Sequence, residues 1–327
     1  MKAVVYEKYG SPEVLKLKEI EQPTPGEHEV MIKIHAASVN SWDWDLLTGS
    51  PPLYRLLFGL TKPKYKILGA DIAGRVEVVG KNAAKFQPGD EVFGDLCNYR
   101  WGGFAEYVCA NENALTFKPA SMTYEQAAAI PQAAVLALQG IYDYGKVNSG
   151  QKVLINGAGG GVGTFAIQMA KSLGAEVTAV DSGEKLETMC NVGADQVIDY
   201  IKEDFTRNGQ QYDLILDVVG KRSIFDYARA LRSGGSYLMI GGKISLIFQI
   251  LFIGPLFSIM AKKKMRIVAH KPNKDLDIIK QLFESGKIVP VIDKHYTLNE
   301  VPEALQYIGE GRTQGKVIIT IDHQNKT

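Results

Sequence analysis

The residues whose types and spacing most clearly suggest chemistry form a glycine-rich turn near the middle of the chain. An apolar run, Val153–Asn156, leads directly into the turn, and Thr164–Leu173 behind it has apolar residues at helical spacing. A second run, Glu176–Val180, is followed by Asp181, where an acid can bind a ribose hydroxyl. A strand, a glycine turn, a helix, a second strand and an acid in this order predict a unit that binds a dinucleotide.

The turn itself fits the pattern G-x-G-x-x-G, with Ala158 in the place of the first glycine. Alanine is tolerated there if its φ stays negative. Gly160 lets the backbone approach a pyrophosphate, and Gly163 lets helix and strand pack closely. Backbone N–H groups at a helix start attract an anion, so the predicted cofactor contacts also include Gly161 and Val162.

Composition excludes several other classes of protein. The length of 327 residues predicts about two domains, and an apolar content of 46% is enough for hydrophobic cores. The formal net charge of +1 gives no reason to expect a nucleic-acid partner. Cys97, Cys109 and Cys190 are scattered, which argues against a disulfide framework or a structural zinc site. The N-terminus lacks the long apolar segment of a signal peptide, so we expect a cytoplasmic protein.

The pattern of elements changes along the chain. Up to about Pro119, short β-branched runs alternate with turn signals, with strands predicted over Ala3–Tyr6, Val14–Ile20 and Val30–Ala37. A helical segment over Thr123–Tyr144 follows. Strands and helices then alternate, which predicts an α/β fold with a parallel sheet and right-handed crossovers. The predicted strands after the dinucleotide unit are Gln196–Ile198, Leu214–Val218 and Tyr237–Ile240, with helices over Glu184–Val192 and Ile224–Leu231.

Separated motifs follow one another in order along almost the whole chain, from Met1 to about Ile321: Asn40 with Asp43, Gly69–Gly74, Pro88–Gly94, Gly102–Tyr107, the glycine turn and Gly193–Tyr200. Together they resemble the medium-chain dehydrogenase/reductase superfamily, and within it the zinc-free quinone oxidoreductase branch. This resemblance implies a GroES-like β-domain over residues 1–122 and 280–327. It also implies an inserted Rossmann dinucleotide-binding domain over residues 123–279, with a substrate cleft at the boundary.

The resemblance also bears on metal content. In zinc-bearing relatives a cysteine stands at the position of Asn40, and a His-Glu pair stands at Ala70 and Asp71. Catalytic zinc needs three protein ligands, so these replacements predict an enzyme without zinc. Reduction of a quinone or a conjugated C=C bond is then favoured over direct alcohol oxidation, because hydrogen bonds alone can polarise a ketone oxygen.

The cofactor preference depends on the residues after the second strand of the dinucleotide unit. Asp181 alone favours NADH, because a carboxylate repels a 2′-phosphate. Ser182, Lys185 and Tyr200 resemble the 2′-phosphate pocket of NADPH-using quinone oxidoreductases, and Arg312 near the C-terminus is a candidate to complete it. A lysine, a hydroxyl and an arginine suit a phosphate dianion. We therefore expect NADP(H) as the preferred cofactor, with NAD(H) as the alternative.

Two residues are candidates for catalysis. Asn40 can bind the nicotinamide ribose or a substrate oxygen, or it can cap a turn. Many relatives carry a tyrosine or lysine five residues later as a possible proton donor, where this chain has Asp45. An aspartate with its ordinary pKa near 3.9 cannot donate a proton at neutral pH. Without strong desolvation, Asp45 is therefore a solvated helix residue and water is the donor. Gln132, where the family lines the nicotinamide pocket, and Gly241 complete the predicted cofactor contacts.

The stretch Ile244–Met260 is almost entirely apolar and is followed by three lysines. It is shorter than the roughly 20 residues of a membrane span and is broken at Gly254, so we expect no stable membrane insertion. We interpret it as a mobile lid over the substrate, with a peripheral membrane contact as the less favoured alternative. Met265–Ala269 is predicted as an edge strand that pairs with its counterpart in a homodimer, as in the superfamily.

The sequence thus predicts an NAD(P)H-dependent, zinc-independent oxidoreductase that transfers a hydride to quinones or α,β-unsaturated carbonyls. One alternative is an alcohol dehydrogenase, with or without zinc. Another is a regulatory protein that binds the cofactor without turnover, because the usual tyrosine or lysine is missing at Asp45. The physiological substrate is not specified by the sequence.

Overall fold

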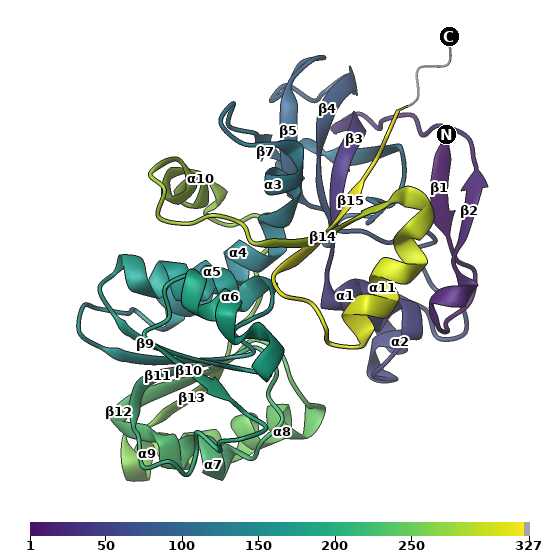
Figure 1. The fold of residues 1–327 in the computed structure, drawn as a ribbon. Coiled ribbons are helices and arrows are strands. Elements are labelled where there is room, and N and C mark those ends of the chain that lie inside the picture. Colours follow the sequence, from purple (N-terminus) through teal and green to yellow (C-terminus); the bar gives the residue numbers. More distant parts are fainter. Residues whose placement is uncertain (324–327) are drawn as a thin grey trace. The chain divides into compact units, whose positions relative to one another are not determined.

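The computed structural model describes residues 1–323 and divides the chain into two compact units (Figure 1). The first unit comprises Met1–Gln132, Pro272–Leu276 and Ile292–Thr327, described up to residue 323. The second unit comprises Ala133–Lys271 and Asp277–Val291. The observed α/β architecture confirms the predicted fold class.

The first unit is built on a seven-stranded sheet in the order β14-β15-β3-β4-β5-β7, with β6 also paired to β3. Its strands are β3 (Glu29–Val39), β4 (Asp71–Val79), β5 (Glu91–Asp95), β6 (Tyr107–Asn111), β7 (Thr116–Phe117), β14 (Ile292–Thr297) and β15 (Lys316–Thr320). The long β3 is buried along most of its length and contacts three neighbours, so it organises the core of this unit.

Shorter elements surround this sheet. A two-stranded antiparallel ribbon joins β1 (Lys2–Val5) and β2 (Lys16–Glu19), and the predicted strand Val14–Ile20 is shortened because Pro12–Val14 forms a 3₁₀ turn. The helices are α1 (Ser41–Thr48), α2 (Leu53–Phe58), α3 (Tyr124–Ala129) and α11 (Val301–Gly309), with 3₁₀ turns at Glu112–Ala114 and Leu298–Glu300.

The second unit contains a six-stranded parallel sheet in the order β10-β9-β8-β11-β12-β13. Numbered from β8, this is the order 3-2-1-4-5-6 of the dinucleotide-binding doubly wound fold, which confirms the predicted Rossmann topology. The strands are β8 (Lys152–Asn156), β9 (Glu176–Asp181), β10 (Gln196–Asp199), β11 (Tyr212–Asp217), β12 (Leu231–Met239) and β13 (Lys264–Ile267).

Helices cover both faces of this sheet, as Figure 1 shows: α5 and α6 lie on one face, and α7, α8 and α9 lie on the other. The helices are α4 (Pro131–Leu138), α5 (Gly161–Ser172), α6 (Leu186–Asn191), α7 (Ile224–Ala230), α8 (Ile244–Phe252), α9 (Gly254–Ala261) and α10 (Leu276–Glu284), with a π-helix at Gln139–Tyr144 and a 3₁₀ turn at Gly183–Lys185. The predicted helix over Thr123–Tyr144 is therefore three consecutive segments, α3, α4 and the π-helix.

The compact units differ from the predicted domain boundaries at three places. Residues 272–276 belong to the first unit, where the side chain of Asn273 forms hydrogen bonds to the backbone N–H and carbonyl of Asp95, both at 2.8 Å. Residues 123–132 belong to the first unit, because α3 packs against β3 and β4, and the backbone N–H of Gln132 donates to Asp71 at 3.1 Å. Residues 280–291 belong to the second unit, where the side chain of Gln168 on α5 forms hydrogen bonds to both backbone groups of Val289.

The apolar stretch after β12 forms the crossover to β13. It consists of α8 and α9, bent by 45° at a break beside Gly254. Within residues 1–323, no single helix is long and apolar enough to cross a membrane, although this bent pair would pass by length and composition alone. β13 is the last strand of its sheet, which confirms the predicted edge strand.

Candidate active site

The glycine turn starts where β8 ends. Gly157 has a φ of +80°, which favours glycine, and it reverses the chain at the carboxyl end of the strand. The backbone N–H groups of Gly157 and Ala158 both donate to the carbonyl of Val180 on β9, at 2.9 and 3.1 Å. Ala158 does not have a positive φ, so the condition for alanine at this position is met.

Gly160 and Gly163 differ in the space around them. A Cβ atom on Gly163 would lie 2.4 Å from the Cα of Ala158, so this glycine is needed for close packing of α5 on the turn. A Cβ atom on Gly160 would meet only the Gly157 carbonyl oxygen, at 3.7 Å. Open space therefore lies in front of Gly160, at the N-terminus of a twelve-residue helix.

The start of α5 offers donors to that space. Thr164 is the first residue of the helix whose N–H bonds back to Gly160. Helix geometry leaves the N–H groups of Gly161, Val162 and Gly163 without acceptors inside the helix. These groups and the helix dipole suit the pyrophosphate of a dinucleotide, so the turn fits the predicted cofactor.

Asp181 and Lys185 form an ion pair beside the turn, with Lys185 Nζ 3.4 Å from Asp181 Oδ1. Asp181 also accepts hydrogen bonds from the backbone N–H groups of Gly159 and Ser182, at 2.9 and 2.8 Å. The stem of Lys185 lies over Gly159, where a Cβ atom would be 2.6 Å from that of Lys185. Both charged side chains are buried and hold the turn in place.

The other predicted cofactor residues are more scattered. Tyr200 follows β10, is 47% exposed, and donates its backbone N–H to the carbonyl of Asp181. Gly241 follows β12, at the same carboxyl edge of the sheet as the glycine turn, and a Cβ atom there would be 2.6 Å from the carbonyl oxygen of Val218. Arg312 belongs to the first unit, where its guanidinium pairs with Glu310 and lies over the ring of Tyr307. Its predicted contact with a phosphate remains a prediction.

A buried network behind the turn was not predicted from the sequence. Asp217 at the end of β11 accepts hydrogen bonds from Asn156 Nδ2 at 2.8 Å and from the hydroxyl of Tyr237 at 2.7 Å. Burial raises the pKa of Asp217, and these hydrogen bonds oppose the shift. The polar residues that end β8 and β11 were the available signal, because neighbouring parallel strands end at one edge.

Asn40 lies in a second polar region, inside the first unit. It is the N-cap residue of α1, and its amide Nδ2 donates to Asp71 Oδ2 at 2.9 Å, while its Oδ1 accepts from Lys316 Nζ. Asp71 also accepts from Ser38 and from the backbone N–H of Gln132, both at 3.1 Å. We call Ser38, Asn40, Asp71 and Lys316 the buried polar cluster; each is at most 7% exposed.

Burial acts on both charges of this cluster. It raises the pKa of Asp71 and lowers the pKa of Lys316, and the attraction between Lys316 Nζ and Asp71 Oδ2, 3.6 Å apart, opposes both shifts. Lys316 was not among the site residues predicted from the sequence. Its only signal was a charged residue at the start of the apolar strand Lys316–Thr320.

A second buried carboxylate lies on α1. Asp43 accepts hydrogen bonds from the backbone N–H groups of Asn40 and Gly69, both at 2.8 Å. Burial raises the pKa of Asp43 to about 7. Asp43 thus joins the start of α1 to the loop before β4 and has a structural role in positioning Asn40.

Asp45 departs from the interpretation as an ordinary solvated acid. It is only partly exposed on α1, and burial raises its pKa to about 6. Its charge in turn contributes to a raised pKa at Tyr54. The sequence-based expectation of an ordinary pKa is therefore wrong, because Asp45 is partly buried on α1. An aspartate with this pKa carries a proton in part of the molecules near neutral pH.

Gln132 has one unused polar group. Its side-chain Nε2 is buried and has no hydrogen-bond partner within the described part of the chain. A buried donor without an acceptor is rare in folded proteins, and a bound ligand is one common reason for it. The carboxamide side chain of Gln132 is therefore suited to an acceptor on a cofactor, and its contact with the cofactor stays a prediction.

Comparisons with known proteins agree with this geometry. An alcohol dehydrogenase GroES-like domain matches residues 26–120, an alanine dehydrogenase/PNT C-terminal domain matches residues 128–220, and a zinc-binding dehydrogenase domain matches residues 192–319. The mitochondrial NAD(P)H oxidoreductase RTN4IP1 of Bos taurus is 34% identical over 98% of this chain and 89% of its own. The 2-methylene-furan-3-one reductase of Solanum lycopersicum is 33% identical over 98% of this chain and 79% of its own.

Comparison with solved structures also finds a quinone oxidoreductase. The quinone oxidoreductase from Coxiella burnetii superposes with a TM-score of 0.84 at 28% identity, over 98% of this chain and 99% of that chain.

Proposed function

Because the chain belongs to the medium-chain dehydrogenase/reductase superfamily, in its quinone oxidoreductase and enone reductase branch, we propose that it reduces quinones or α,β-unsaturated carbonyls with NADPH and without zinc. The observation that carries the zinc-free assignment is the ammonium group of Lys316. It bonds to Asn40 and lies 3.6 Å from Asp71, the two cluster residues at the positions of zinc ligands or their neighbours in zinc-bearing relatives.

Coordination chemistry supports this proposal. Zinc prefers thiolate, imidazole and carboxylate ligands, and Asn40 offers only an amide at the position of the cysteine. A buried ammonium that bonds to Asn40 Oδ1 and lies 3.6 Å from Asp71 Oδ2 repels a divalent cation. The donor set therefore suits an internal ion pair and does not suit a catalytic metal.

The proposed reaction divides between the cofactor and the chain. Bound NADPH would supply a hydride to the electrophilic carbon, which leaves the substrate in need of one proton. Asp45 holds a proton that it can release near neutral pH, because burial raises its pKa to about 6. Asn40 retains one amide N–H beyond the bond to Asp71, and this group suits a substrate or ribose oxygen.

The NADPH preference is proposed from Lys185. Its ammonium group lies beside the turn and is already oriented by Asp181. Ser182 and Tyr200, which each carry a hydroxyl group, directly follow the neighbouring strands β9 and β10. Lys185 also neutralises much of the repulsion between Asp181 and a 2′-phosphate. A cytoplasmic location and a homodimer through β13 stay predictions.

The test is a turnover assay combined with metal analysis. We expect the purified protein to oxidise NADPH with a simple quinone or an enone, to prefer NADPH to NADH, and to keep its activity after treatment with a chelator. One tightly bound zinc per chain that is required for turnover would support the alcohol dehydrogenase alternative. Tight NADPH binding without turnover on any quinone, enone or aldehyde would support the regulatory alternative.

A further inference from the structure

The helices α7, α8 and α9 cover one face of the second unit's sheet (Figure 1). Their exposed residues form a large apolar surface. In α8 and α9 the exposed apolar residues recur at the same i, i+3, i+4 spacing, so each helix presents one apolar stripe. The ring of Phe225 on α7 contacts that of Phe257 on α9, with centroids 5.6 Å apart. We call this surface the apolar face; its residues are 54% to 84% exposed and are Phe225, Phe248, Leu251, Phe252, Leu256, Ile259 and Met260.

The chain around the apolar face has an unusual charge pattern. Residues 227–274 contain no aspartate or glutamate, although acids make up 36 of the 327 residues of the chain. The same segment contains nine basic residues: Arg229, Arg232, Lys243, Lys262, Lys263, Lys264, Arg266, Lys271 and Lys274. The apolar face is therefore flanked along the chain by positive charge that no acid in the segment offsets.

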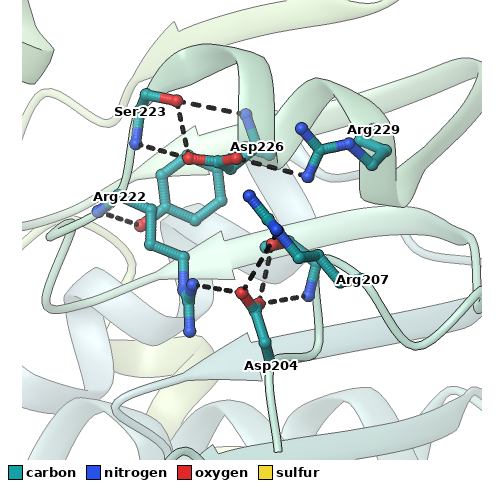
Figure 2. A network of polar contacts seen from close by, with 8 residues as sticks. Asp204, Arg207, Arg222, Ser223, Asp226 and Arg229 are labelled. Atoms are coloured by element: carbon teal, nitrogen blue, oxygen red, sulfur yellow. Dashed lines mark hydrogen bonds and ion pairs between the residues drawn. The ribbon is translucent and has the colours of Figure 1, made fainter.

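Some of the basic residues near the apolar face are paired with acidic side chains, and others are not. Figure 2 shows that Arg222 and Arg207 pair with Asp204, while Arg229 pairs with Asp226 at the start of α7. Lys243 and Lys262 are exposed at the two ends of the helix pair, and within residues 1–323 no acid forms an ion pair with either of them. Lys263 is different, because its ammonium group donates to the carbonyl of Ala228 at 2.7 Å.

The helix pair is anchored to the sheet. Leu246 and Ile250 of α8 are buried in the core of the second unit, and Gly254 is packed against Met265 of β13. The side chain of Gln249 accepts a hydrogen bond at 2.9 Å from the backbone N–H of Ile224, at the start of α7. Withdrawing the pair to span a bilayer would expose this core, so only its outer face is available to a partner.

We propose that the apolar face is a docking surface for an anionic lipid bilayer. Exposed phenylalanine, leucine, isoleucine and methionine side chains enter the boundary between headgroups and acyl chains, as those of interfacial amphipathic helices do. Lys243 and Lys262 face the acidic headgroups, whereas Lys264 and Arg266 point to the other face of the sheet, because Met265 between them packs against α8. The contact is peripheral and reversible, and it does not depend on the proposed reductase activity.

Charge argues against a second copy of this chain as the occupant. A two-fold interface centred on the apolar face would place the same surface on both sides, and with it the same unpaired lysines. Like charges brought together in this way oppose association. A bilayer of acidic lipids supplies both the apolar volume and the opposite charge.

The direct test is co-sedimentation of the full chain with vesicles. We expect binding to vesicles of phosphatidylcholine with phosphatidylglycerol, weaker binding at higher ionic strength, and little binding to phosphatidylcholine alone. The variant Lys243→Gln/Lys262→Gln should bind the mixed vesicles roughly 25-fold more weakly, since each cation near an anionic surface contributes about fivefold. The variant Phe252→Gln/Met260→Gln should lose at least about tenfold.

Matched variants separate docking from folding. Ile278→Gln/Val289→Gln changes two exposed apolar residues elsewhere in the second unit, and Lys8→Gln/Lys81→Gln changes two exposed lysines of the first unit. Both controls should bind vesicles as the wild type does, and all variants should keep the wild-type melting temperature. Equal binding of the wild type and of Phe252→Gln/Met260→Gln would overturn the proposal. So would the absence of vesicle binding together with a dimer that Phe252→Gln/Met260→Gln dissociates, because the face would then join two copies.

Discussion

The glycine turn of the second unit and the buried polar cluster of the first unit differ in how their polar groups are used. In the second unit, the glycine turn keeps space open: a Cβ atom on Gly160 would meet only one protein atom within 4 Å, at 3.7 Å. In the first unit, the buried polar cluster fills its space with its own partners, and Asp71 alone accepts hydrogen bonds from Ser38, Asn40 and Gln132. The turn is thus shaped for a ligand, whereas the cluster is shaped to stabilise buried charges.

This difference changes how each region responds to substitution. In a ligand-binding site, a small substitution leaves the stability of the free protein nearly unchanged. Its main effect is to lower the affinity for the ligand. In a buried cluster whose charged groups pair with one another, removal of one partner lowers folding stability, because the remaining charge stays buried without its partner. Substitutions in the two regions should therefore separate into losses of affinity and losses of stability.

The largest effect should follow from removing the ammonium group of the cluster. Lys316→Met leaves Asp71 buried without its opposite charge, and we expect the free energy of unfolding to fall by about 3–5 kcal/mol. Urea denaturation measures this loss. The double variant Asp71→Asn/Lys316→Met should recover a large part of it. The control Lys152→Met breaks an exposed ion pair with Glu176 and should change stability by less than about 1 kcal/mol. If the two single variants had equal effects, the cluster would not be an ion pair of structural importance.

Two alanine substitutions in the glycine turn should give opposite results. Gly163→Ala places a Cβ atom 2.4 Å from the backbone of Ala158, and we expect a loss of about 1–3 kcal/mol in stability. Gly160→Ala fits sterically and should change stability by about 0.5 kcal/mol or less. The added methyl group occupies the space of a pyrophosphate, so NADPH affinity should fall roughly tenfold or more.

Calorimetric titration with NADPH and thermal denaturation together check this pair of variants. An unstable Gly160→Ala variant, or one that binds NADPH as the wild type does, would show that the open space in front of Gly160 is not the cofactor site.

The same contrast explains what the sequence could predict. The strands, helix and acid around the turn are close in the chain, so hydrophobic periodicity and glycine spacing were enough to place them. Lys316 is 276 positions from Asn40, and the two meet only because β15 pairs antiparallel with β3 and sets Val317 opposite Val39. Long-range pairing of this kind leaves no local pattern, and neither does the burial that raises the pKa of Asp45.

The ion pair beside the turn sharpens the expectation for the cofactor. Lys185→Met should weaken NADPH binding about tenfold, the lower end for a charge-assisted contact, because Lys185 also serves Asp181. NADH has no 2′-phosphate, so its affinity should change much less. Asp181→Asn should weaken both cofactors, because the carboxylate also orients Gly159 and Ser182. Substitution of Asp181 is therefore not expected to exchange the preference between NADPH and NADH.

The measurement is the Kd of each cofactor by nucleotide fluorescence at fixed ionic strength, since salt screens the phosphate contact. Lys202→Met is a matched control, because this lysine is 80% exposed and lies beside Asp199 on the same edge of the sheet. Equal weakening of NADPH and NADH by Lys185→Met would mean that no phosphate contact exists there.

The smallest effect should come from the titration of Asp45. Burial raises the pKa of this carboxyl to about 6 in the folded protein, from 3.8 as its ordinary value. The folded state therefore binds the proton more tightly, and the stabilisation is complete below pH 4 and is lost as the pH rises through 6. The rise of this pKa from 3.8 to about 6 corresponds to at most ~3 kcal/mol of stability, and partial exposure reduces this to about 1 kcal/mol. Relative to the wild type, Asp45→Asn should gain about that much stability between pH 5 and pH 8, whereas Glu187→Gln, on the surface of α6, should show no such trend.

The same variant tests the proton donor. If Asp45 supplies the proton, kcat for quinone or enone reduction by the wild type should fall as the pH rises through about 6, because the carboxylate has no proton to give. Asp45→Asn should have a lower kcat and a pH profile without this step, with the Kd of NADPH unchanged. A variant that keeps the wild-type step would leave water as the donor. The raised pKa would then be only a consequence of how α1 packs. Asp45, like the buried polar cluster of the first unit, would have a structural role and no role in catalysis.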